Sequence, residues 1–125
     1  MSTATYNMSI NAGEDFYLTL VIKDSLGVLI DLTGKSFAGQ IREAWDSTDP
    51  SATFVCTISN QSTNKGEVVI KLPHTQSNLM TFTGSKNANK RPTTDFIYDI
   101  EQTDLSGDVT RILQGTATFS PQVTR

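Results

Sequence analysis

Few residues of this sequence could do chemistry, and His74 and Cys56 are the first to consider. They are the only histidine and the only cysteine among 125 residues. Nucleophilic catalysis needs a nucleophile, a base within hydrogen-bonding reach and a group that orients the base. His74 directly follows Pro73, with no cysteine or serine motif around it, so we expect a loop or capping residue. Cys56 alternates in phase with Phe54 and Ile58, which predicts a buried, unreactive thiol.

Carboxylates form the second pattern with chemical potential. Asp99 and Glu101 are two residues apart, so a strand would place both on one face, and Asp104 follows in a turn. Glycoside hydrolysis uses such a pair. The same spacing is typical of the solvated outer face of a sheet, which is the interpretation we favour. Asp46 and Asp49 share another loop but supply too few oxygen ligands for a calcium site. We therefore predict no enzymatic activity, no metal and no cofactor.

One basic cluster occurs in the chain, in the loop 84–92. It contains Lys86, Lys90 and Arg91, without interleaved aromatic residues, and the chain as a whole has a net charge of −3. Binding to nucleic acid needs clustered cations and, for single strands, aromatic stacking platforms. We predict no nucleic-acid partner, and we expect the loop to be solvated or to contact an acidic neighbouring protein. No run approaches the roughly 20 apolar residues that cross a bilayer, so no membrane association is predicted.

The elements that must position these residues are strands. In the segment 16–23, Phe16, Leu18 and Leu20 point one way, while Tyr17 and Thr19 point the other. Further short strands are predicted at 28–34, 36–44, 53–59, 67–73, 95–104, 109–114 and 115–119. In three of them alternation predicts these inward residues: Phe37, Gly39 and Ile41 in 36–44; Val68, Ile70 and Leu72 in 67–73; and Phe96, Tyr98 and Ile100 in 95–104. Turn residues, glycines and prolines separate the strands, and a positive φ is expected at Gly27 in the turn after the segment 16–23. Seven to nine short strands favour a two-layer antiparallel β-sandwich, with a small barrel as the alternative.

The only helix candidate is the segment 74–82, where Thr75 could cap one short turn. Its apolar residues would then pack as a lid; they are Leu79, Met80 and Phe82. The length suits one domain that spans residues 1–125. We expect residues 1–10 to form an N-terminal arm and residues 121–125 a C-terminal tail. The first residues lack the basic and apolar stretches of a signal peptide. With a single cysteine no disulfide can form within the chain, so we expect it to fold in a reducing cytosol.

Several segments, taken in order, resemble small virion proteins of tailed phages. The opening reads NAGEDF at 11–16, KDSLG at 23–27 and IDLTG at 30–34. The middle reads GEVVIKLP at 66–73, and the ending reads YDIE at 98–101, VTRILQG at 109–115 and SPQVTR at 120–125. Gln122 stands where an acidic residue is common. The opening is similar to that of the N-terminal domain of phage baseplate upper proteins, an immunoglobulin-like sandwich that anchors receptor-binding parts to the tail.

The resemblance implies an all-β, immunoglobulin-like antiparallel sandwich with one short helical turn. It also implies a non-enzymatic structural or adaptor protein of the virion tail, baseplate or neck, made in the host cytoplasm. Its partners would be other virion structural proteins in a symmetric assembly of several copies. Two alternatives remain open: a capsid decoration or cement protein, and a carbohydrate-binding module. The aromatic residues available to stack on sugars are Tyr6, Tyr17, Trp45 and Tyr98.

We expect partner contacts at the N-terminal arm, the basic loop, the C-terminal tail and the single tryptophan. Tryptophan is enriched among the residues that contribute most to interfaces. The expected contact residues are Tyr6, Met8, Ile10, Trp45, Lys86, Lys90, Arg91, Pro121, Val123 and Arg125.

Overall fold

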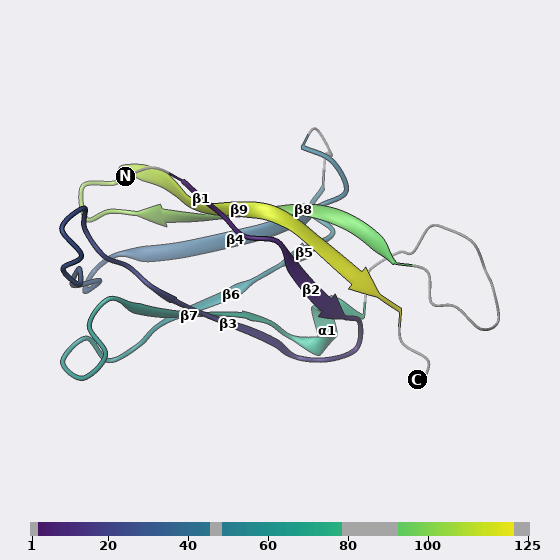
Figure 1. The fold of residues 1–125 in the computed structure, drawn as a ribbon, viewed down its shortest axis with the longest axis horizontal. Helices are drawn as coiled ribbons and strands as arrows, with labels where there is room; N and C mark the ends of the chain where they lie inside the picture. Colours follow the sequence, from purple (N-terminus) through teal and green to yellow (C-terminus); the bar gives the residue numbers. More distant parts are fainter. Residues whose placement is uncertain (1–2, 46–48, 79–92, 122–125) are drawn as a thin grey trace.

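The computed structural model describes residues 3–45, 49–78 and 93–121 of the chain. Nine strands and one helical turn make up the described part (Figure 1). In chain order they are β1 (Ala4–Thr5), β2 (Met8–Asn11), β3 (Phe16–Val21), β4 (Ser36–Arg42), β5 (Ala52–Thr53), β6 (Val55–Ile58), β7 (Glu67–Leu72), α1 (His74–Ser77), β8 (Thr94–Thr103) and β9 (Val109–Ser120).

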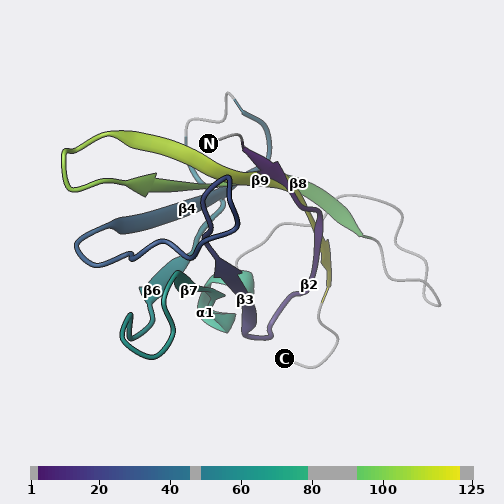
Figure 2. The ribbon, with the colours of Figure 1, turned by 60° about the vertical axis from the view of Figure 1, so that its left-hand side comes forward.

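The strands form two sheets that face each other, as Figures 1 and 2 show from two directions. The larger sheet has the order β1-β9-β8-β4-β5, with β2 also pairing with β9, and the smaller sheet has the order β3-β7-β6. All pairings are antiparallel except those of β1 and β2, which run parallel to β9. The predicted β-sandwich with one helical turn is confirmed. Among the described residues neither sheet closes on itself, so the alternative of a small barrel is wrong.

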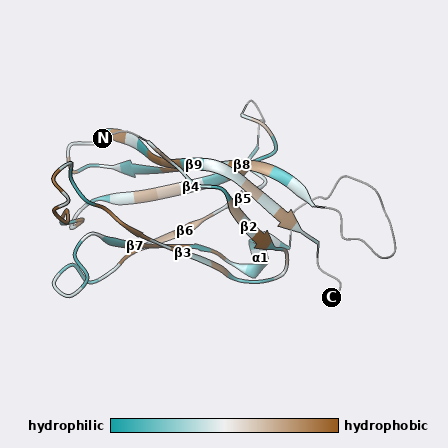
Figure 3. Ribbon diagram, in the orientation of Figure 1, coloured by the Kyte–Doolittle hydropathy of each residue, from teal (hydrophilic) through white to brown (hydrophobic). Residues whose placement is uncertain are grey.

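Alternating side chains explain which face of each strand is buried. Apolar and polar residues alternate along most strands, which Figure 3 shows as changes of colour along the ribbons. The apolar faces of both sheets meet between the layers, as expected for a sandwich. The buried core comprises Met8, Ile10, Ile22, Leu32, Ile41, Ala52, Phe54, Val68, Ile70, Leu72, Phe96, Tyr98, Ile100, Ile112, Leu113, Ala117 and Phe119. The inward faces predicted for β3, β4, β7 and β8 are those that the structure buries.

The N-terminal segment corrects one prediction. Met8 and Ile10 are 3% and 2% exposed, and they lie opposite Ala117 and Phe119 in the parallel pairing of β2 with β9. The expectation that residues 1–10 form an arm outside the core is therefore wrong for this stretch. Its apolar residues are two positions apart, so a strand along the free side of β9 buries both of them.

Two smaller predictions also change. The strand predicted at 28–34 does not form, and this segment contributes only an isolated bridge between Lys23 and Leu29. The carboxylate of Asp24 closes the turn before it by accepting hydrogen bonds from the N–H groups of Leu26 and Val28. Thr75 does not cap α1, which begins at His74 without a side-chain cap of its own. The predicted lid residues lie outside the described residues; they are Leu79, Met80 and Phe82.

Candidate functional site

An open groove of about 520 Å³ lies against the larger sheet. We call it the outer groove, because outward-pointing side chains of β1, β9, β8 and β4 form most of its floor. The segment that follows β4 supplies part of its rim. The outer groove is lined by Thr5, Asn7, Gln40, Arg42, Trp45, Ile97, Tyr98, Asp99, Arg111, Gln114, Gly115 and Thr116.

The sheet register arranges the polar side chains of the floor in a row. Thr5 lies opposite Gln114, Gln114 opposite Asp99, and Asp99 opposite Gln40. Directly opposed residues of neighbouring strands share a face and are close enough to interact. The next row along the strands consists of Thr116, Ile97 and Arg42. Four strands, of which only β8 and β9 are consecutive in the sequence, thus contribute to one polar surface.

Polar contacts within the floor fix the orientation of its side chains. The Nε atom of Arg111 lies 3.4 Å from Oδ2 of Asp99, and Nη1 of Arg111 donates to Oε1 of Gln114 at 3.1 Å. Nη2 of Arg42 donates to Oε1 of Gln40 at 2.9 Å. The Arg111–Asp99 pair is partly exposed, so it adds little to stability. Its consequence is that the charge of Asp99 offsets that of Arg111, one of the two arginines that line the groove.

Trp45 lies on the rim of the outer groove, three residues after β4 ends at Arg42. Its side chain is 90% exposed, the highest value among the large hydrophobic residues of the described part. In Figures 1 and 2 the described parts of the β4–β5 connection rise from the larger sheet on the side away from the smaller sheet. Trp45 is therefore a surface residue, and its contact with a partner stays a prediction.

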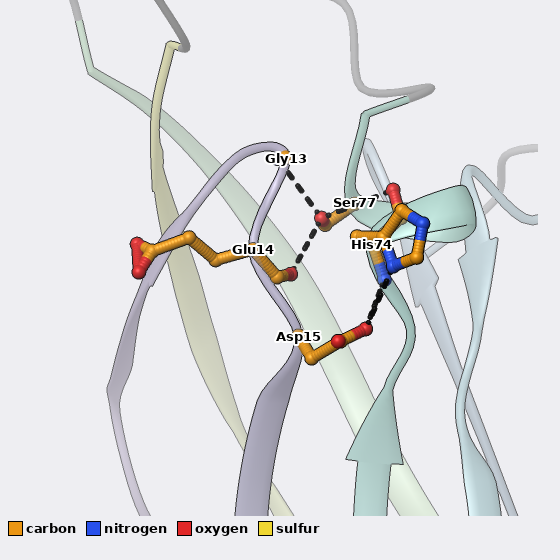
Figure 4. A network of polar contacts seen from close by, with 5 residues as sticks. All are labelled: Gly13, Glu14, Asp15, His74 and Ser77. Carbon is orange, nitrogen blue, oxygen red and sulfur yellow. Dashed lines mark hydrogen bonds and ion pairs between the residues drawn. The ribbon is translucent and has the colours of Figure 1, made fainter. Parts of the chain in front are cut away.

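A second polar cluster joins the β2–β3 turn to α1 (Figure 4). The backbone N–H of His74 donates to Oδ1 of Asp15 at 2.7 Å, and Nδ1 of His74 lies 3.0 Å from the same oxygen. Nearby, the hydroxyl of Ser77 accepts from the N–H of Gly13 at 3.0 Å and donates to the carbonyl of Glu14 at 2.9 Å. A carboxylate, a histidine and a serine are thus neighbours in this cluster.

The geometry of this cluster is that of a structural link. The Ser77 side chain is fully buried, and its hydrogen bonds join it to backbone atoms of the turn and of α1. Its proton therefore points to a carbonyl oxygen, whereas a catalytic serine would give it to an imidazole. The pKa of Asp15 is held below its usual value. The largest cause is the hydrogen bond from the backbone N–H of His74, and the next is the hydrogen bond from the ring of His74. Asp15 acts as the cap that α1 lacks in its own sequence.

Cys56 and the carboxylates of β8 match the faces predicted for them. Cys56 is half-buried on the inward face of β6, and burial raises the pKa of its thiol to about 11. Asp99 and Glu101 both point outward, and Asp99 is held by Arg111. Within residues 3–45, 49–78 and 93–121, no group of three or more His, Cys, Asp or Glu side chains is arranged to hold a metal ion.

The expected contact residues fall into three groups. Tyr6 and Trp45 are exposed, and Pro121 is half-buried directly after β9. Met8 and Ile10 belong to the core and are not surface contacts in this fold. The remaining five lie outside the described residues; they are Lys86, Lys90, Arg91, Val123 and Arg125.

The sequence did not single out the polar side chains of the floor, above all Gln40, Gln114 and Arg111. Their only signal is an outward phase in the strand alternation, as for Gln40 between inward Gly39 and Ile41. That phase places a residue on the outer face but does not say which strand lies next to it. The register was therefore needed to find the groove.

Fold and surface together define a β-sandwich domain with a polar groove on its larger sheet. Comparison with protein-family models and with curated proteins gives no match for this chain. Its one described helix has four residues, and no helix of the described part is long and apolar enough to cross a membrane.

Proposed function

We propose that this protein is a non-enzymatic structural adaptor of a tailed-phage virion, placed in the tail, baseplate or neck. It would join larger virion proteins in a symmetric assembly of several copies. Two things support this proposal: the ordered resemblance of its segments to small virion proteins, and a β-sandwich with an open edge strand.

The observation that carries the adaptor role is strand β3. Among the described strands it is an edge of the smaller sheet, since the strand order there is β3-β7-β6. Its six residues, FYLTLV, include no charged residue, proline or glycine. Natural monomers usually block an edge strand with such residues, because free N–H and C=O groups pair with other chains. An unblocked edge of this length suits the addition of a partner strand.

The outer surface beside this edge supports the same role. Tyr17 and Val21 on β3 are 59% and 51% exposed, and Val55 on β6 is 50% exposed. Val55 and Tyr17 both lie opposite Lys71 of the central strand β7, on either side of it. A partner strand at β3 would extend this partly apolar face and cover Tyr17 and Val21. Backbone pairing would then supply affinity, and the alternate side chains would supply specificity.

A charged residue in the middle of β3 tests the edge. Thr19 is exposed and lies in the centre of the strand, so Thr19→Lys should leave the free energy of unfolding within about 0.5 kcal/mol of the wild type. Incorporation into particles should fall at least about tenfold, because a lysine disfavours pairing at an edge. Thr57→Lys is the control, with the same change on the same outer face but on β6, the shorter strand at the opposite edge of this sheet. Equal loss for both variants, or normal incorporation of Thr19→Lys, would contradict the role of β3.

The place in the particle is tested by quantitative mass spectrometry of separated head and tail fractions. We expect a handful to dozens of copies in the tail fraction. Hundreds of copies in the head fraction would instead identify a capsid decoration protein. Absence from both fractions would overturn the virion assignment.

A further inference from the structure

The exposed indole of Trp45 lies away from the β3 edge, which is the surface on which the proposed adaptor role rests. A tryptophan side chain is large and apolar, and here 90% of it is exposed beside a groove whose floor is polar. The β3 edge lies in the smaller sheet, whereas Trp45 follows β4 of the larger sheet. The two surfaces are therefore independent features of the molecule.

The floor beside Trp45 offers donors and acceptors in fixed positions. Gln40, Asp99 and Gln114 form one row, and Arg42 and Arg111 hold them by contacts of 2.9 to 3.4 Å. The side chains of Gln40, Asp99 and Gln114 each have more hydrogen-bonding capacity than these contacts inside the floor use. A ligand that both donates and accepts at closely spaced positions would satisfy that capacity.

We propose that the outer groove binds a short oligosaccharide. Trp45 stacks on the apolar C–H face of one pyranose ring, since an indole offers a large rigid face. The hydroxyl groups of the sugar, each both a donor and an acceptor, bind Gln40, Asp99 and Gln114. An apolar wall with a few well-placed polar groups is the usual composition of a small-molecule site, and the volume of about 520 Å³ lies in the usual range.

The backbone of the floor disfavours a peptide in this groove. The floor strand β8 has β4 on one side and β9 on the other, and β9 in turn is covered by β1 and β2. The main-chain N–H and C=O groups of β8 and β9 already form hydrogen bonds within the sheet, so an extended peptide could not pair with these strands.

The charges disfavour a nucleic acid, and the aromatic residues limit the length of the sugar. A phosphate backbone requires clustered cations, but the floor pairs Arg111 with Asp99.

A long polysaccharide requires a row of exposed rings. Tyr98 is only 4% exposed, Tyr17 lies on the other sheet, and Tyr6 is exposed but does not line the groove, so the part of the chain that the structure describes places no row of exposed aromatic residues beside Trp45. One indole suits a ligand of one to three sugar units.

The fluorescence of the protein reports on this site directly, because Trp45 is the only tryptophan of the chain. The test is a titration of the full chain with a panel of neutral and acidic mono-, di- and trisaccharides up to millimolar concentration. At least one sugar should shift the emission to shorter wavelength in a saturable manner, because stacking removes the indole from water. Amide NMR shifts should then map to β4, β8 and β9.

Variants locate the binding and separate it from non-specific effects. Trp45→Ala and Gln40→Ala should each weaken binding of that sugar at least about tenfold, measured by NMR or calorimetry. Tyr17→Ala, an exposed aromatic residue of the other sheet, and Glu101→Gln, on the same outer face outside the groove, should bind as the wild type does. Circular dichroism checks that all four variants are folded.

Three results would overturn the proposal. They are no saturable shift with any sugar, a shift that saturates at the same sugar concentration in Gln40→Ala as in the wild type, and a shift produced by unstructured peptides rather than sugars. None of these results bears on the β3 edge, so the glycan site and the adaptor role fail separately.

Discussion

The hydroxyl group of Tyr98 donates a hydrogen bond to the backbone carbonyl of Tyr6, which lies 92 residues earlier in the chain. Tyr6 stands between β1 and β2, where the N-terminal segment passes along β9. Tyr98 lies opposite Gly115 of β9, so its ring must reach past that glycine to meet the carbonyl. The contact ties the first strands to the centre of the larger sheet. Burial and the neighbouring Tyr6 raise the pKa of Tyr98 to about 12, so the hydroxyl remains a donor at neutral pH.

Removal of this hydroxyl should destabilise the fold. Tyr98→Phe loses one hydrogen bond and leaves the carbonyl of Tyr6 without this donor, which should cost about 1–2 kcal/mol in the free energy of unfolding. Urea denaturation at neutral pH measures the change. Tyr17→Phe makes the same chemical change at an exposed site and should stay within about 0.5 kcal/mol of the wild type. Identical stability of both variants would show that the Tyr98–Tyr6 contact is not stabilising.

A side chain at Gly115 should displace the N-terminal strands. A Cβ atom built there would lie 2.1 Å from the carbonyl oxygen of Tyr6, so Gly115→Ala forces the backbone of the N-terminal segment to move. We expect a loss of about 2–3 kcal/mol, typical of overpacking, together with faster hydrogen exchange in β1 and β2. Gly27→Ala is the control: its φ of 83° is unfavourable for alanine, but its Cβ would meet no atom within 4 Å. That control should lose only about 1 kcal/mol and leave exchange in β1 and β2 unchanged.

Acid should weaken the link between Asp15 and α1. Hydrogen bonds from His74 favour the charged carboxylate, so its pKa is lower in the folded than in the unfolded protein. The resulting stabilisation is complete above the unfolded pKa of about 3.9 and is lost as the pH falls through the folded pKa. The stability difference between wild type and Asp15→Asn should therefore be largest above about pH 4 and should shrink toward pH 2.

Urea denaturation between pH 2 and pH 7 measures this difference. Glu101→Gln controls for the loss of one exposed negative charge. A difference between wild type and Asp15→Asn that does not change with pH would argue against a role for the charge of Asp15.

The thiol of Cys56 should react slowly in the folded protein. Its pKa of about 11 leaves little thiolate at pH 8, whereas an unfolded cysteine has a pKa of about 8.5. Alkylation by iodoacetamide at pH 8 should therefore be on the order of a hundredfold slower than in denaturant. The same protein in concentrated urea is the internal control, and equal rates in the two conditions would count against burial of the thiol.

Much of the fold could be predicted from the sequence. Alternation predicted the inward faces of β3, β4, β7 and β8, because the period of a strand is a local property. Turn residues separated the strands, and Gly27 has the positive φ expected at its turn. The N-terminal residues were misjudged, since nothing local indicates that Met8 and Ile10 pair with a strand more than a hundred residues away.

The candidate site was less predictable. The sequence pointed to Trp45 and to the outward face of Asp99, but not to the partners that complete the groove. Gln40, Asp99 and Gln114 are neighbours only because β8 pairs with β4 on one side and with β9 on the other. The residues near His74 show the same limit. Its carboxylate partner, Asp15, is 59 residues away and was not predicted.

By itself the sequence determined which side chains of most strands face the core, where many turns fall, and that Trp45 and Cys56 are the only residues of their kinds. These properties follow from short-range geometry, since a strand repeats every two residues whatever lies beside it. The tertiary structure alone decided which strands are neighbours. It thereby placed the N-terminal strands on β9, the cap of α1 at Asp15 and the polar row beneath Trp45. The physical reason is that the register between distant segments depends on the packing of the whole sandwich.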